Sequence, residues 1–164
     1  MRLIFAAFLA CAAAFSTNAQ AKLESGDAPP DSLGLDKDKR EIKVSDYRGK
    51  VVVVTFWASW CGYCLKELPV LENVQRTLGA EQIAVVAINT DKDYSKYREM
   101  RRRMKDFELI MTEDRDELAV ARQYGVSGLP HMLMIDKQGK VAFTHVGYSE
   151  KMLPQIVDEI NELL

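Results

Sequence analysis

VVVVTFWASWCGYCLKELP, residues 51–69, decides the fold of this 164-residue chain. Its first part, Val51–Trp57, is a continuous apolar and largely β-branched run, which is typical of a strand buried on both faces of a sheet. After a short turn, Leu68 and Leu71 begin a helical repeat of apolar residues that ends at Gly79. A buried strand therefore leads directly into a helix, and two cysteines stand at the junction.

The rest of the chain alternates between strand and helix patterns. Apolar runs predict strands at 83–89, 108–112, 131–136 and 140–147, and helical spacing predicts helices at 94–105, 116–125 and at the end of the chain. Residues 33–47 predict two short strands around a charged DKDK turn. The final helix is expected to turn these residues inward: Leu153, Ile156, Val157, Ile160 and Leu164. We therefore expect an α/β fold with a central mixed sheet flanked by helices.

The N-terminus has the pattern of a secretory signal peptide. Arg2 is the only charge in the first 21 residues, residues 3–15 are apolar, and Ala19 and Ala21 form an A-x-A site. We expect cleavage after Ala21 and a periplasmic or otherwise exported protein. The apolar run is shorter than the roughly 20 residues that span a membrane. An uncleaved anchor is the alternative, and lipid modification of Cys11 is a weaker one.

Composition bounds the remaining organisation. Residues 22–32 are polar and contain Pro29 and Pro30, so we expect a flexible lead before one domain at 33–164. The net charge of −2 argues against a nucleic-acid-binding protein, which needs a strong basic excess. We expect a monomer.

The two cysteines of the exported chain, Cys61 and Cys64, are the candidate reactive groups. The loop between them is too short to restrict an unfolded chain much, which argues against a purely structural disulfide. At a helix start, free backbone N–H groups and the helix dipole favour a thiolate. We expect Cys61 to be exposed and nucleophilic, and Cys64 to be the shielded thiol that resolves the mixed disulfide.

Two segments resemble a known family. FWASWCGYC, residues 56–64, looks like the active-site segment of thioredoxins. Residues 46–69 and YGVSGLPHMLMIDKQGKV, residues 124–141, resemble the TlpA/ResA-like branch of exported thioredoxin-like proteins. The resemblance covers roughly residues 30–160. It implies a thioredoxin fold with an N-terminal β-hairpin extension and an inserted βα unit, and a thiol–disulfide oxidoreductase without an organic cofactor.

The resemblance assigns roles to further residues. Pro130 falls where the family has a cis-proline facing the disulfide, with the backbone around Leu129 pairing with substrate peptide and the ring blocking metal capture. Glu67 falls where this branch has an acidic residue that tunes the thiols. Cytoplasmic thioredoxins carry a buried Asp on the preceding strand, and that position is Thr55 here. The alternative for Glu67 is a solvated helix glutamate.

The residues around the cysteines bear on docking and direction. Trp60 is expected on the docking surface together with Gly62 and Tyr63, whereas Trp57 is expected in the core. Gly62-Tyr63 departs from the dipeptides usual in this branch and leaves the direction of electron flow open, although we expect a reductant. Substrate proteins with disulfides or thiols and a membrane thiol carrier as electron donor are the expected partners.

Other hypotheses come from His131 and from the charges. His131 follows Pro130 and either stabilises a thiolate or points elsewhere. A copper metallochaperone is the alternative function, because two cysteines and a histidine suit Cu(I), but the narrow cysteine spacing and Pro130 argue against it. Structural zinc needs four ligands, and we expect no metal site.

A basic run at 98–105 is expected to be a solvated face, with a membrane or partner contact as the lesser option.

Overall fold

The computed structural model describes residues 22–164, so the predicted signal peptide at 1–21 lies outside the described residues. The described chain forms one sheet of seven strands in the order β2-β1-β5-β4-β3-β6-β7. In chain order the elements are β1 (Ser32–Leu35), β2 (Glu41–Lys43), β3 (Val51–Trp57), α1 (Gly62–Leu78), β4 (Ile83–Asn89), α2 (Tyr94–Arg103), β5 (Ile110–Glu113), α3 (Ala119–Gln123), β6 (His131–Ile135), β7 (Val141–Val146) and α4 (Leu153–Leu163). Strands β3, β4 and β5 are parallel, whereas β6 and β7 form an antiparallel hairpin beside β3. The predicted mixed sheet is confirmed.

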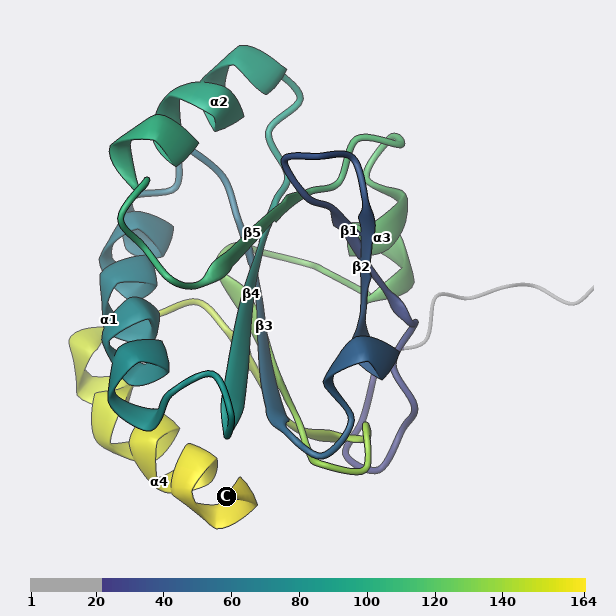
Figure 1. Cartoon of the computed structure of the whole chain (residues 1–164), viewed down its shortest axis with the longest axis vertical. Coiled ribbons are helices and arrows are strands. Elements are labelled where there is room, and N and C mark those ends of the chain that lie inside the picture. Colours follow the sequence, from purple (N-terminus) through teal and green to yellow (C-terminus); the bar gives the residue numbers. More distant parts are fainter. Residues whose placement is uncertain (1–21) are drawn as a thin grey trace, which may run out of the picture.

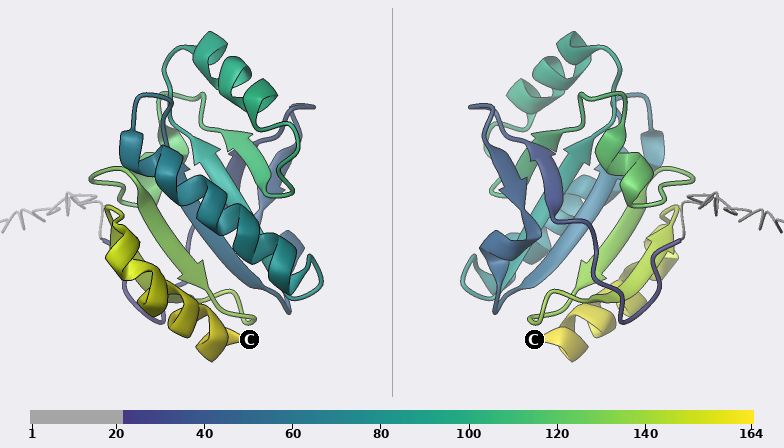
Figure 2. Two further views of the ribbon diagram at one scale, coloured as in Figure 1. Left: turned by 90° about the vertical axis from the view of Figure 1, so that its left-hand side faces the viewer. Right: turned by 90° about the vertical axis from the view of Figure 1, so that its right-hand side faces the viewer.

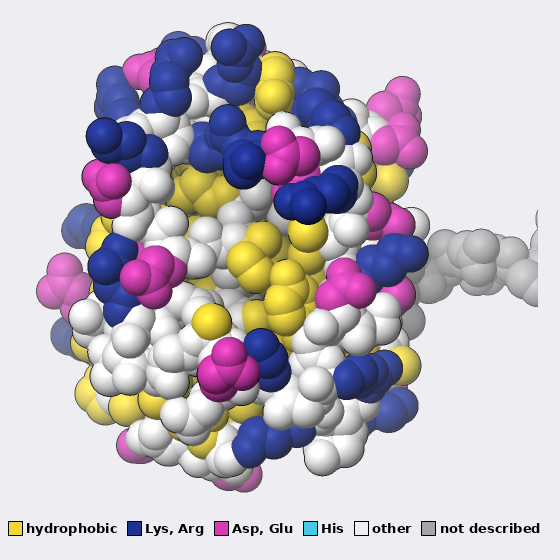
Figure 3. All heavy atoms as spheres, viewed as in Figure 1, with side chains coloured by type: hydrophobic (Ala, Val, Ile, Leu, Met, Phe, Trp, Pro, Cys, Tyr) yellow, Lys and Arg dark blue, Asp and Glu magenta, His cyan; other side chains and the backbone are white. Residues whose placement is uncertain are grey.

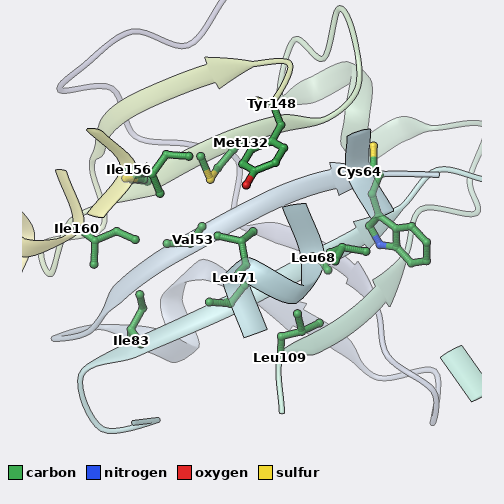
Figure 4. Close-up of a cluster of buried hydrophobic side chains, with 14 of the residues drawn as sticks. Val53, Cys64, Leu68, Leu71, Ile83, Leu109, Met132, Tyr148, Ile156 and Ile160 are labelled. Carbon is green, nitrogen blue, oxygen red and sulfur yellow. The ribbon is translucent and has the colours of Figure 1, made fainter. Parts of the chain in front are cut away.

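Strand β3 lies inside the sheet between β4 and β6, and its side chains contribute to the two core layers on either face. Val53 and Trp57 contribute to the layer that α1, α2 and α4 cover, and Val54 and Phe56 contribute to the layer beneath α3. Figures 1 and 2 show α1 and α4 on one face of the sheet and α3 on the other. Figure 4 shows side chains of α1, α4 and the central strands meeting in the first layer. Every residue of β3 is buried, which is why this strand carries almost no polar side chains.

The N-terminal hairpin is also confirmed. Strands β1 and β2 pair antiparallel, and the Asp36 carboxylate closes the turn by accepting hydrogen bonds from the backbone N–H groups of Asp38 and Arg40. The preceding residues 22–31 contain no helix or strand. Backbone hydrogen bonds at Gly26 and Asp27 nevertheless join this segment to Val141, the first residue of β7.

Two elements begin later than the sequence predicts, because buried carboxylates take their first backbone N–H groups. The strand expected from residue 108 begins at Ile110, since Glu72 of α1 accepts hydrogen bonds from the amides of Glu108 and Leu109. The helix expected from residue 116 begins at Ala119, where Asp114 accepts from the amides of Val120 and Ala121.

One prediction about the last helix is wrong. Ile156 and Ile160 are buried against the sheet, but Val157 is 38% exposed. Positions 156 and 160 lie on one stripe of the helix, and position 157 is turned about 100° away from Ile156. Helix α4 thus presents a narrower apolar stripe than the sequence predicts. Within residues 22–164, no helix is long and apolar enough to cross a membrane.

Candidate active site

The two cysteines form a disulfide at the junction of β3 and α1. Cys61 is the N-cap of α1, and its sulfur accepts a hydrogen bond of 3.2 Å from the backbone N–H of Cys64. Cys61 is 6% exposed and Cys64 is fully buried. The predicted order of exposure is right, although Cys61 is more covered than expected. The sulfur of Cys61 therefore lies where unpaired N–H groups of a helix start stabilise a thiolate.

Two aromatic side chains flank the disulfide on the surface. Trp60 is 74% exposed and Tyr63 is 60% exposed, whereas Trp57 is fully buried. Gly62, the first residue of α1, has open space where a side chain would begin. Large aromatic rings that are this exposed are typical of surfaces that bind a partner. Trp60 and Tyr63 therefore form a candidate docking face around the sulfur atoms.

Glu67 is a buried carboxyl group between α1 and β3. It lies one helical turn beyond Cys64 and is 1% exposed. One carboxyl oxygen accepts a hydrogen bond of 2.6 Å from the Thr55 hydroxyl, and the other has no partner. Burial raises the pKa of Glu67 to about 7, against the weaker opposing effect of the Thr55 hydrogen bond. A carboxyl group with this pKa can both accept and donate a proton near neutral pH. The alternative of a solvated glutamate is excluded by its burial.

Pro130 lies at the same end of the sheet. Strand β6 pairs with β3 so that His131 faces Phe56, which puts Pro130 just beyond the pair, toward the disulfide end of β3. The Leu129–Pro130 peptide bond is cis, as the resemblance implies. Pro130 is buried, and its carbonyl accepts a hydrogen bond from the Gly147 backbone N–H.

The sequence matches a known protein family over most of its length. The redoxin family model matches residues 24–161. The chain belongs to the redoxin family. It is 31% identical over 116 residues to the thiol-disulfide oxidoreductase ResA of Geobacillus thermodenitrificans, covering 71% of this chain and 66% of that protein. It is 29% identical to ResA of Bacillus subtilis, covering 73% of this chain and 65% of that protein. This redoxin thus spans about two thirds of the length of these relatives.

A solved structure extends the comparison over most of the chain. A Chlorobium tepidum protein assigned as a thiol:disulfide interchange protein DsbE is 32% identical, with a TM-score of 0.74. The match covers 85% of this redoxin and 99% of that protein. The predicted thioredoxin-like fold, the ResA-like resemblance and the enzyme class, thiol–disulfide oxidoreductase, are therefore confirmed at the level of the family.

His131 lies on the other side of the sheet from the cysteines. Its ring packs edge-on against Phe56 in the layer beneath α3, with ring centroids 6.3 Å apart, whereas Cys64 belongs to the layer beneath α1. Burial lowers the pKa of His131, which favours the neutral imidazole. Of the two hypotheses for His131, the structure supports the one in which the ring points away from the thiols. The histidine that a copper site needs is therefore not supplied by this residue.

Asp91 is a site residue that the sequence analysis missed in this redoxin. Its carboxylate accepts hydrogen bonds from the backbone N–H and the hydroxyl of Ser59, and from the side chain of Asn89. It thereby fixes the turn that presents Trp60 and Cys61. The available signal was an acidic residue just after strand β4, since the carboxyl ends of neighbouring parallel strands meet at one edge. Within residues 22–164, no group of three metal-binding side chains gathers.

Proposed function

We propose that this redoxin reduces disulfides of substrate proteins outside the cytoplasm, using the dithiol form of Cys61 and Cys64. The observation that supports this best is the disulfide itself, placed at the start of α1 beside an exposed tryptophan and one helical turn from a buried carboxyl group. A disulfide that closes so small a loop contributes little to stability, so its value lies in exchange.

The reaction proceeds in two exchange steps. The Cys61 thiolate attacks a substrate disulfide, so that one substrate sulfur bonds to Cys61 and the other leaves as a thiolate, which takes a proton. Cys64 then loses its proton and attacks the Cys61 sulfur, which forms the Cys61–Cys64 disulfide and releases the second substrate thiol. Two electrons pass to the substrate, and the protein must then be reduced by another dithiol.

Glu67 is the proposed proton acceptor for Cys64. It follows Cys64 by one turn on the same helix face, and a carboxyl group with a pKa of about 7 is half ionised near neutral pH. Thr55 holds one carboxyl oxygen by its hydrogen bond and leaves the other without a partner. Glu67 thus has a fixed position and an oxygen available for the thiol proton.

Docking is assigned to the surface around the sulfur atoms. Trp60, Gly62 and Tyr63 present the face on one side, and Leu129 with Pro130 borders the site from the segment just before β6. We propose that substrate backbone pairs beside Leu129, whose side chain is half-buried.

The direction of electron flow, the cellular location and the partners are proposed from the sequence as a whole. The A-x-A pattern at Ala19 and Ala21 supports export by a signal peptide, and export supports a membrane thiol carrier as the electron donor. The protein acts as a monomer in this proposal. Reduction rather than oxidation is proposed, and the reduction potential of the cysteine pair tests it, because a value near −270 mV supports a reductant and one near −120 mV an oxidant.

Two cysteine variants test the exchange mechanism. Cys61→Ser removes the attacking sulfur and should abolish reduction of a disulfide substrate such as insulin. Cys64→Ser should accumulate mixed disulfides between Cys61 and the substrate, visible by non-reducing electrophoresis and mass spectrometry. Full activity in both variants would refute the mechanism, and exchange of their behaviour would reverse the two roles.

A further inference from the structure

A groove lies beside the turn that precedes Cys61 and extends toward α3 and the start of α2. It has a volume of about 640 Å³ and begins at Trp60 and Leu129. Its inner wall is largely apolar and includes Leu118 and Val126. The groove begins at the exposed tryptophan beside Cys61. When a cysteine of a substrate polypeptide reaches Cys61, the residues next to that cysteine can therefore lie in the groove.

The outer rim of the groove carries cations without carboxylate partners. Lys92, Lys96 and Arg122 line the groove and are exposed. None of the three forms an ion pair with a described residue. Among the described residues, the guanidinium of Arg122 donates to the backbone carbonyl of Glu117. These charges are therefore free to meet a partner.

The acidic groups of the same groove, Asp91 and Asp93, accept hydrogen bonds from neighbouring residues of the chain. Asp91 accepts from Ser59, as described above. Asp93 is the N-cap of α2 and accepts a hydrogen bond of 2.9 Å from the backbone N–H of Ser95. The bonds from Ser59 and Asn89 hold the Asp91 carboxylate against the chain, and Asp93 is exposed. The groove thus presents three exposed cations, Lys92, Lys96 and Arg122, and one exposed carboxylate.

The segment beside the groove is positively charged, although the whole chain is slightly negative. Residues 92–106 contain seven Lys and Arg against three Asp and Glu, a net charge of +4 in a chain whose net charge is −2. Figure 3 shows Lys and Arg side chains gathered over the end of the molecule where Figure 1 places α2. This positive end adjoins the groove at Lys92 and Lys96, so it attracts a negatively charged partner toward the disulfide.

We propose that this groove docks substrate polypeptides in which an apolar residue follows the reactive cysteine and acidic residues lie further along. The apolar side chain packs against Trp60 and Leu129, and the acidic side chains meet Lys92, Lys96 and Arg122. This inference rests on the proposed thiol–disulfide exchange and adds the substrate class. A polypeptide is favoured over a membrane surface because the cations border a concave groove that adjoins Trp60, the residue before Cys61.

The test uses two peptides that share an intramolecular disulfide and a leucine after the second cysteine. One continues with three glutamates and the other with three lysines. The pre-reduced protein should reduce the acidic peptide about tenfold faster at low salt, as measured by chromatography of the peptide thiols in single turnovers. The preference should disappear at 0.5 M salt, where the screening length falls to a few ångströms.

Charge reversal identifies the residues. Lys92→Glu/Lys96→Glu should favour the lysine peptide instead, and Lys96→Glu places an acid in the first turn of α2, where it suits the helix dipole. The matched control is Lys50→Glu/Lys140→Glu, which reverses the same number of charges. Lys50 and Lys140 directly precede β3 and β7, at the end of the sheet away from the disulfide, so this variant should keep the wild-type preference. Circular dichroism checks that each variant is folded.

The outcomes separate this inference from the proposed function. Hydroxyethyl disulfide is small and uncharged, so the wild-type protein should reduce it whether or not the groove binds peptides. If the wild type reduces it but treats the two peptides alike, the docking inference is overturned and the exchange activity stands. If the preference survives in Lys92→Glu/Lys96→Glu, the assigned residues are wrong. If the wild type reduces no disulfide, the proposed function fails and the docking inference with it.

Discussion

Replacing Glu67 by Gln tests whether its burial imposes a pH-dependent cost on the fold. The pKa of Glu67 is about 7 in the folded chain against an ordinary value of 4.5. At 1.36 kcal/mol per pH unit, this difference makes ionisation of the folded protein cost about 3 kcal/mol. Below pH 4.5 both states are protonated and the cost is absent. Between pH 4.5 and 7 the folded state binds more protons, so stability falls as pH rises, and above pH 7 the full cost applies.

Glu67→Gln removes this titration while keeping the shape of the side chain. Between pH 5 and pH 8, the unfolding free energy of the wild type should fall by about 2.5 kcal/mol relative to that of the variant. The measurement is urea unfolding of the oxidised proteins at several pH values, because the disulfide then keeps the thiols from titrating. The amide introduced by Gln changes stability by a constant, and this constant cancels when the two pH slopes are compared.

Glu72→Gln is the matched control on the same helix. Glu72 is also buried, but hydrogen bonds from the Glu108 and Leu109 amides and from Arg76 outweigh the effect of burial and lower its pKa. Its contribution to stability is therefore lost as pH falls, so Glu72→Gln should flatten the acidic side of the curve and leave the slope between pH 5 and 8 unchanged. Parallel curves for the wild type and Glu67→Gln across pH 5–8 would refute the assignment of a raised pKa to Glu67.

Two further changes follow from the same contacts. Thr55→Val keeps the volume but removes the hydroxyl donor to Glu67, so the pKa of Glu67 should rise above about 7, as followed by infrared absorption of its carboxyl group; an unchanged or lower pKa would contradict the hydrogen bond. Ile156→Ala should lower the unfolding free energy by about 2–5 kcal/mol, whereas Val157→Ala should change it by less than about 1 kcal/mol, since only Ile156 is buried. Equal losses in urea unfolding would contradict the observed orientation of α4.

The parts of the fold that sequence predicts well are those in which one local pattern decides the structure. Strands β3 and β4 have the predicted bounds because every position except Thr55 and Asn89 is apolar, so these strands can be buried on both faces. The starts of β5 and α3 differ from the predicted ones because the Glu72 and Asp114 carboxylates accept hydrogen bonds from backbone N–H groups near the start of each element. Glu72 is 36 residues from Glu108, so this contact exists only once α1 and the strand are packed together.

In the site, too, local sequence patterns predict some features, whereas others depend on packing between distant residues. The positions of Cys61 and Cys64 follow from a strand that leads into a helix, and the helix repeat places Glu67 on the face of Cys64. The burial of Glu67 does not follow from the helix repeat, because it depends on how closely α1 packs on β3 at Thr55. The side on which His131 lies depends on strand alternation and pairing register, and a single residue of register shift would move its ring to the face of the thiols.

The burial of Glu67 links the stability of the fold to its proposed chemistry. An exposed glutamate has a pKa near 4.5 and is almost fully ionised at neutral pH, so it accepts the proton of a thiol only weakly. Burial beside Thr55 brings the pKa of Glu67 to about 7, where the group both accepts and releases a proton, and the same burial makes the ionised fold less stable. An apolar residue at this position would remove that cost. If Glu67 serves proton transfer, such a variant gains stability at pH 8 and resolves mixed disulfides more slowly, and a variant that gains stability without slowing would leave the carboxyl group with no part in the exchange.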